Sequence, residues 1–124
     1  MKIVVFGPDR RVGVLRGDDV VDISRAYAKL VHERDGEGHP SELASALVPA
    51  DLERFIEGGD RALDHARAAL DYLFEQADDR AGANGEALIH PSGSVKLHAP
   101  RPKGARVACA GGNFADHSQA RAER

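Results

Sequence analysis

The residues best suited to chemistry lie near the C-terminus, where an apolar run is followed by two glycines, an asparagine and a histidine. Gly111 and Gly112 let backbone approach a ligand closely, and Asn113 is typical of a residue that caps the start of a helix. The first amide groups of a helix are free donors that favour a carboxylate or a developing oxyanion. His117 would follow on the first turn, where a neutral imidazole can take a proton from water. The pattern predicts a water-activating site. The alternative is an ordinary glycine turn followed by a solvated histidine.

Other groups that could do chemistry are weaker candidates. The glycines match neither G-x-G-x-x-G nor a phosphate-binding loop. His90 and His98 share parity in an extended segment, but Pro91 and Gly93 intervene, so we do not expect a metal pair. Cys109 lies in an apolar run and is interpreted as a small core residue rather than a nucleophile. The remaining candidates are interpreted as solvated or structural groups: His32, His39, His65, Ser24, Ser41, Ser118, Asp35 with Glu37, and Asp51 with Glu53.

The elements that precede this region read as a small α+β unit. Short apolar runs at residues 3–6, 12–16 and 20–23 are separated by turn clusters and predict an antiparallel meander of three strands. Asp22 or Ser24 is expected to cap the helix that follows. The expected helices cover residues 25–32, 41–47, 51–57 and 60–77, and the last has the clearest amphipathic stripe.

A polar, glycine-bearing stretch at residues 78–86 predicts a linker. Three short apolar runs follow at residues 87–89, 95–97 and 106–110, and we expect each to be a strand, with intervening prolines that prevent continuous pairing. The chain is therefore divided into a small N-terminal α+β domain (1–80), a linker with extended strands (81–105), and the start of a second domain (106–124).

Composition limits the class of protein. The chain has 124 residues, which is room for one domain of modest core, and its single cysteine excludes an internal disulfide. No stretch has the length of a membrane span or of a secretory signal, so we expect a cytoplasmic protein that does not enter a membrane. The formal charge of −3 conceals an acidic middle and a basic C-terminal stretch. The acidic helices argue against nucleic-acid binding, although a basic tail that contacts RNA is a weaker alternative.

Two stretches of the chain resemble a known family. Residues 95–102 read VKLHAPRP and residues 106–117 read RVACAGGNFADH, which is similar to the "KL..P.P......G.NY.DH" stretch at the start of the catalytic domain in the fumarylacetoacetate hydrolase family. The preceding strands and helices look like the small N-terminal domain found in many members. The resemblance implies an α+β fold that leads into the first strands of a β-rich catalytic domain.

The resemblance also implies an activity on small anionic 2-oxo or 1,3-dioxo acids, by C–C bond hydrolysis, decarboxylation or isomerisation. His117 matches the histidine that activates water, and Gly111, Gly112, Asn113 and Phe114 form the neighbouring turn and are expected to contact substrate. Two departures stand out. The family usually has a tyrosine where Phe114 stands, and a glutamate at the position of Ala120.

Mg²⁺ or Mn²⁺ is the cofactor that the resemblance implies, bound through an acidic E-x-E and a further aspartate downstream of the histidine. Only one acid, Glu123, follows His117 in this sequence, so we expect the metal ligands to lie outside this chain. The hypothesis is an N-terminal part of such an enzyme, inactive alone, in a homodimer or with a chain that carries the rest of the catalytic domain. The alternative is a non-catalytic binding or assembly module that docks to a separate catalytic polypeptide.

Overall fold

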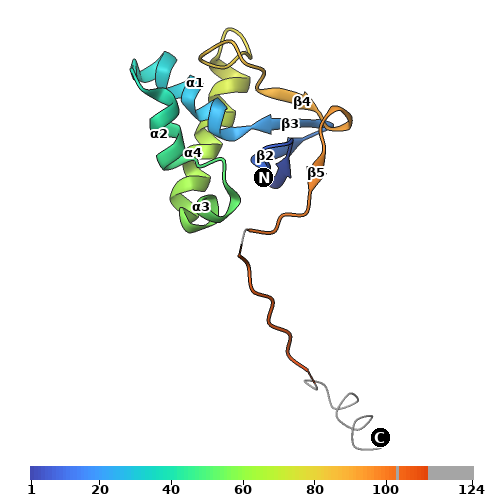
Figure 1. Ribbon diagram of the computed structural model, residues 1–124. Coiled ribbons are helices and arrows are strands. Elements are labelled where there is room, and N and C mark those ends of the chain that lie inside the picture. Colours follow the sequence, from blue (N-terminus) through green and yellow to red (C-terminus); the bar gives the residue numbers. More distant parts are fainter. Residues whose placement is uncertain (103, 112–124) are drawn as a thin grey trace, which may run out of the picture.

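The computed structural model describes residues 1–102 and 104–111, in which one antiparallel sheet is covered by helices on one side (Figure 1). The sheet has five strands in the order β4-β3-β2-β1-β5. Their bounds are β1 Lys2–Phe6, β2 Arg11–Arg16, β3 Asp19–Asp22, β4 Ile89–Pro91 and β5 Leu97–His98. The α+β class predicted from the sequence is confirmed.

The first three strands form the predicted meander. β1 pairs with β2 and β2 with β3, both antiparallel, so that Val5 lies opposite Val12 and Val14 opposite Val21. The turns between these strands contain Gly7 at φ 73° and Gly17 at φ 60°. These are left-handed conformations that glycine adopts without steric cost.

Four α-helices follow the sequence prediction with small changes at their ends. They are α1 (Ile23–Asp35), α2 (Pro40–Leu47), α3 (Leu52–Glu57) and α4 (Gly59–Asp71), and α4 continues into a π-helical turn, η1 (Tyr72–Gln76). Asp22 caps α1 through its side chain, which settles the choice between Asp22 and Ser24, and Asp51 caps α3 in the same way. Ile23, expected at the end of a strand, is instead the first residue of α1.

The main core lies between the sheet and helices α1 and α4. Val5, Val12, Val14 and Val21 contribute the sheet side of this core, and all four are buried. The helices supply apolar side chains that include Ile23, Ala26, Leu30, Ala66, Ala69 and Leu73. Alternate residues of each strand thus face the helices, as period-2 patterning requires.

A second, smaller apolar cluster lies outside this main core. Phe6 and Val20 are buried, and a Cβ built on Gly13 would lie only 2.9 Å from carbon atoms of both side chains. The Phe6 ring therefore occupies the space that a side chain at position 13 would need. The ring of His90, on β4, lies 5.5 Å from the Phe6 ring.

The last two strands lie at opposite edges of the sheet. β4 pairs with β3 and β5 pairs with β1, and a short 3₁₀ turn, η2 (Ser92–Ser94), lies between them. Both strands are displaced toward the C-terminus from the predicted runs 87–89 and 95–97. Pro91 ends β4, where an edge position tolerates a residue without an amide hydrogen. The extended residues beyond the predicted linker thus complete the sheet of the N-terminal unit.

The strand predicted at residues 106–110 is wrong. Residues 105–111 contain no strand or helix and are exposed, with Val107 80% exposed. Cys109 is also exposed, so its interpretation as a core residue is incorrect. The physical reason is that a short apolar run is stable as a strand only where a neighbour satisfies its backbone groups, and no described strand pairs with this run.

No helix in the described ranges combines the length and apolarity that crossing a membrane requires.

Candidate functional site

The predicted water-activating site lies almost entirely outside the described residues. Gly111 is the last residue that the structure describes, and it is exposed and outside any helix or strand. Gly112, Asn113, Phe114 and His117 fall beyond it. The role assigned to these residues from the sequence therefore stays a prediction.

Three of the other histidines lie on helix α4 and on the two edge strands of the sheet. His65 is half-buried on α4, and its ring lies edge-on to Tyr27, with 5.1 Å between the ring centroids. His90 and His98 lie on the two opposite edge strands, and His98 uses Nε2 toward the Gly7 carbonyl oxygen at 2.7 Å. The two histidines thus lie on strands that are not hydrogen-bonded to each other.

The best-organised polar group on the sheet side is built around Asp22. Its carboxylate is fully buried and accepts two hydrogen bonds from Arg11, at 2.7 Å from Nε and 3.1 Å from Nη2. It also accepts the Arg25 backbone amide at 3.1 Å as the cap of α1. The Arg25 guanidinium lies farther away, with Nε 3.7 Å from the carboxylate. The hydrogen bonds from Arg11 to Asp22 raise the pKa of Arg11, so its guanidinium stays charged.

Adjacent strands bring this pair together. Asp22 ends β3 opposite Gly13 of β2, and Arg11 lies two positions earlier on the same strand. Residues two apart on a strand share a face, so Arg11 is a diagonal neighbour of Asp22. Arg11 is the first residue of β2, directly after the turn of residues 7–10, and this position places its side chain beside Asp22.

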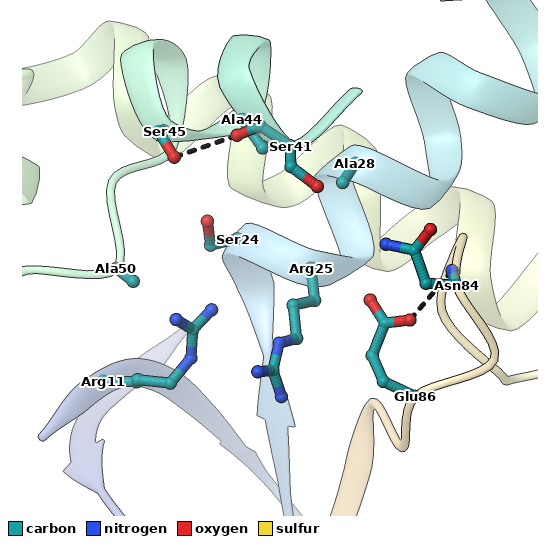
Figure 2. A pocket seen from close by; sticks show the side chains of 10 residues that line it. All are labelled: Arg11, Ser24, Arg25, Ala28, Ser41, Ala44, Ser45, Ala50, Asn84 and Glu86. Atoms are coloured by element: carbon teal, nitrogen blue, oxygen red, sulfur yellow. Dashed lines mark hydrogen bonds between the residues drawn. The ribbon is translucent and has the colours of Figure 1, made fainter. Parts of the chain in front are cut away.

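A cavity of about 360 Å³ opens beside this pair, between α1, α2 and residues 84–86 (Figure 2). Two cationic side chains, one acid and several small polar side chains line it: Arg11, Arg25, Glu86, Asn84, Ser24, Ser41 and Ser45. Ala28 and Ala44 are buried where α1 meets α2, and their small side chains leave the space open. In Figure 2 the two guanidinium groups lie toward the sheet, and the α2 residues lie across the cavity.

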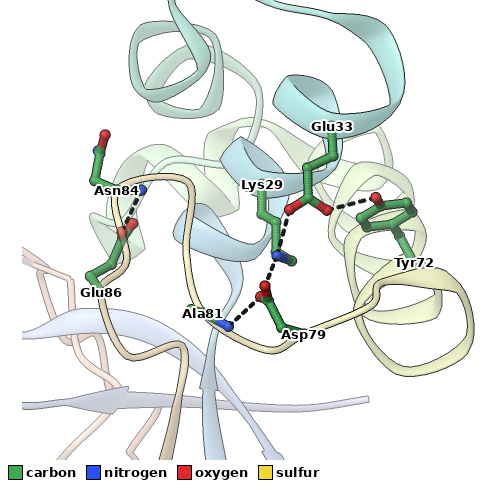
Figure 3. Close-up of polar contacts among 7 residues, drawn as sticks. All are labelled: Lys29, Glu33, Tyr72, Asp79, Ala81, Asn84 and Glu86. Carbon is green, nitrogen blue, oxygen red and sulfur yellow. Dashed lines mark hydrogen bonds and ion pairs between the residues drawn. The ribbon is translucent and has the colours of Figure 1, made fainter.

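A second polar group fixes the linker to the helices (Figure 3). The Lys29 side chain is only 2% exposed, and its amino group donates to Glu33 Oε1 at 2.6 Å and to Asp79 Oδ1 at 2.9 Å. The Tyr72 hydroxyl donates to Glu33 Oε2 at 2.7 Å. Burial opposes the charge on Lys29, but the two carboxylates outweigh it and raise its pKa. The same hydrogen bonds lower the pKa of Glu33 and of Asp79.

Neither polar group fits the cofactor implied by the resemblance. Mg²⁺ and Mn²⁺ favour several carboxylate oxygens around one position. Within residues 1–102 and 104–111, no three His, Cys, Asp or Glu side chains are arranged to hold a metal ion. Asp22, Glu33 and Asp79 are instead each bonded to a cationic side chain.

Neither the cavity nor the hydrogen-bonded group around Lys29 was predicted from the sequence. Lys29 gives a signal, because it falls on the buried stripe of α1 between Ala26 and Leu30, with Glu33 one turn later. Asp79 gives none, since its contact with Lys29 spans 50 residues. The cavity depends on how α1, α2 and the linker pack, which no local pattern shows.

Comparison with family models shows the family to which the chain belongs. The model described as "Fumarylacetoacetase N-terminal" matches residues 6–100, which is most of the chain. This chain belongs to the fumarylacetoacetase N-terminal family. The match ends close to the last strand of the sheet, β5, so the family region and the folded unit nearly coincide. The resemblance to the fumarylacetoacetate hydrolase family is confirmed.

No curated protein and no solved structure matches the chain. The family assignment therefore rests on the fumarylacetoacetase N-terminal match, together with the α+β architecture that the match covers.

Proposed function

We propose that this chain is the N-terminal part of a fumarylacetoacetate hydrolase-like enzyme that acts on small 2-oxo or 1,3-dioxo acids. The observation that supports it is the position of the family match. The match covers most of the folded unit and ends at residue 100, and the larger part of the motif that resembles the catalytic domain, with Gly111 and His117, follows that end. The folded unit is then a companion domain, and chemistry belongs to residues that follow it.

In this proposal His117 takes a proton from water, and Gly111 to Phe114 form the turn that contacts the anionic substrate. Mg²⁺ or Mn²⁺ would be bound by residues other than the described ones, because those do not fit a metal site. The choice among hydrolysis, decarboxylation and isomerisation depends on those residues too.

The coding DNA immediately downstream tests the proposal. Continuation, in frame or after one frameshift, into a segment with an E-x-E motif supports it. A downstream sequence without such a segment counts against a catalytic domain on the same gene and favours the second candidate.

The second candidate is an assembly module that docks to a separate catalytic polypeptide. An apolar groove with a cavity of about 370 Å³ favours it, lined by Ile3, Leu52, Phe55, Ile56, Leu63 and Pro100. Ile56 is 57% exposed, and Pro100 brings the groove next to the segment that leaves the sheet. An Ile56→Glu variant that keeps its fold but loses a catalytic partner in a pull-down would support this candidate. A monodisperse monomer that retains no partner would count against it.

A further inference from the structure

We propose that the cavity between α1, α2 and residues 84–86 binds a small oxyanion, either a carboxylate or a phosphate group. This site is independent of the water-activating site proposed at His117. It is built from residues that the structure describes, and it needs no catalytic domain.

The first support is the Arg25 guanidinium, which forms a long ion pair with Asp22 but makes no hydrogen bond to any described residue. Asp22 is bonded to Arg11 at 2.7 and 3.1 Å and to the Arg25 amide at 3.1 Å. The Arg25 guanidinium, at 3.7 Å, lies beyond hydrogen-bond distance of that carboxylate. In the described part of the chain, the Arg25 side chain makes no hydrogen bond, although it lines the cavity. Its planar set of donors suits a carboxylate or a phosphate.

The second support is a buried hydroxyl. Ser24 is 6% exposed and lines the cavity, and Figure 2 shows its side chain pointing into that space. Asp22 caps α1, so the Ser24 hydroxyl is not used for capping, and no hydrogen bond joins it to another described residue. The Ser24 hydroxyl is therefore available to bond to water or to a ligand in the cavity.

The third support is the uncapped start of α2. Ser24 lies in the first turn of α1 and Ser41 in the first turn of α2, and both line the same cavity. α2 has no side-chain cap at its start. The Asp22 carboxylate already occupies the start of α1, so only the start of α2, whose first turn also carries Glu42, can add a partial positive charge to that of Arg25.

Among the described residues, Glu86 is the one acid that lines the cavity, and its repulsion of a bound anion is reduced because its carboxylate is bonded elsewhere. The Glu86 carboxylate accepts the Asn84 backbone amide at 2.9 Å, and it packs so closely on Gly82 that a Cβ there would overlap it. Glu86 is therefore bonded to its own loop. Arg11 is bonded to Asp22, so Arg25 is the cationic group that an anion in the cavity would contact.

The test is a titration of the ¹⁵N-labelled chain, followed by amide chemical shifts, with sodium phosphate, sodium acetate and sodium chloride in parallel at equal ionic strength. We expect saturable shifts at Ser24, Arg25 and Ser41 with phosphate or acetate, and none with chloride. Saturation by phosphate alone identifies a phosphate site, and saturation by acetate alone identifies a carboxylate site. Linear shifts in all three salts would overturn the proposal.

Variants separate this site from general charge attraction. Arg25→Gln should weaken binding about tenfold, because the charge-assisted contact is lost, and Ser24→Ala should weaken it about threefold. Arg34→Gln is the matched control, since Arg34 is an exposed arginine on the same helix whose partner is Asp35. Equal binding by the wild type and the Arg25→Gln variant would contradict the assignment.

Discussion

The amino group of Lys29 lies 2.9 Å from Asp79 Oδ1 and joins the buried side of α1 to the linker that follows η1. The lysine side chain is 2% exposed, whereas Asp79 is 70% exposed. The contact therefore holds the linker over an amino group that is otherwise cut off from solvent. With Glu33 and Tyr72 it forms one hydrogen-bonded group between helix α1 and the C-terminal part of the fold.

Stability should fall in acid because of this group. Lys29 lowers the pKa of Glu33 and of Asp79 below their ordinary values of 4.5 and 3.8. Between the folded and unfolded pKa values the unfolded chain binds more protons, so the free energy of unfolding rises with pH there. The contribution is fully present above the ordinary values and is lost as the pH falls through the lowered ones. Urea unfolding over a range of about pH 2.5 to 7 measures this.

Lys29→Met is the variant that identifies the cause. It fills the buried space without a charge, so we expect a flatter acid dependence than in the wild type. Glu57→Gln is the control, because Glu57 is an exposed acid at the end of α3 and should leave the slope unchanged. The same slope in wild type and Lys29→Met would show that the group does not control acid stability.

Asp22→Ala should destabilise the fold more than Asp51→Ala. Both aspartates cap a helix by accepting a backbone amide at 3.1 Å, and loss of a cap costs about 1 kcal/mol. Asp22 is also fully buried and paired with Arg11, so its removal leaves a partly buried guanidinium without a partner, at a total of about 3 kcal/mol. Chemical denaturation of the two variants gives the difference directly. Equal losses would mean that the ion pair contributes nothing beyond the cap.

Gly13→Ala should lower the free energy of unfolding by about 1–3 kcal/mol, because the new methyl group meets Phe6 and Val20 at 2.9 Å. Both side chains are buried and have little room to move. Gly38→Ala is the matched control, since a Cβ there meets nothing within 4 Å, and its effect should stay within about 0.5 kcal/mol. Thermal unfolding of both variants checks this. A Gly13→Ala variant as stable as the control would show that the Phe6 ring is free to shift.

Much of the fold was predictable because its signals are local. The meander follows from short β-rich runs between glycine turns, and the caps at Asp22 and Asp51 follow from their positions before apolar helices. The run at residues 106–110 is also short and apolar, but a strand needs a neighbouring strand to pair with. The residues of the run do not show whether such a neighbour exists. Local sequence patterns thus predicted most helices and strands, but they did not show which apolar runs find a partner strand.

The candidate sites were less predictable for a related reason. The Arg11–Asp22 pair needs the register of β2 against β3, and the cavity beside Arg25 needs the packing of α1 against α2. Both depend on contacts between distant parts of the chain. The motif around His117 was recognised by resemblance, and its geometry is not among the described residues.

The central claim is that chemistry requires residues beyond the folded N-terminal unit, and turnover of an acylpyruvate with Mg²⁺ tests it most directly. The 124-residue chain alone should give background rates, whereas a product extended through an E-x-E segment should show metal-dependent turnover that His117→Ala abolishes. Clear turnover by the 124-residue chain alone would contradict the account. So would an extended product whose activity does not depend on His117.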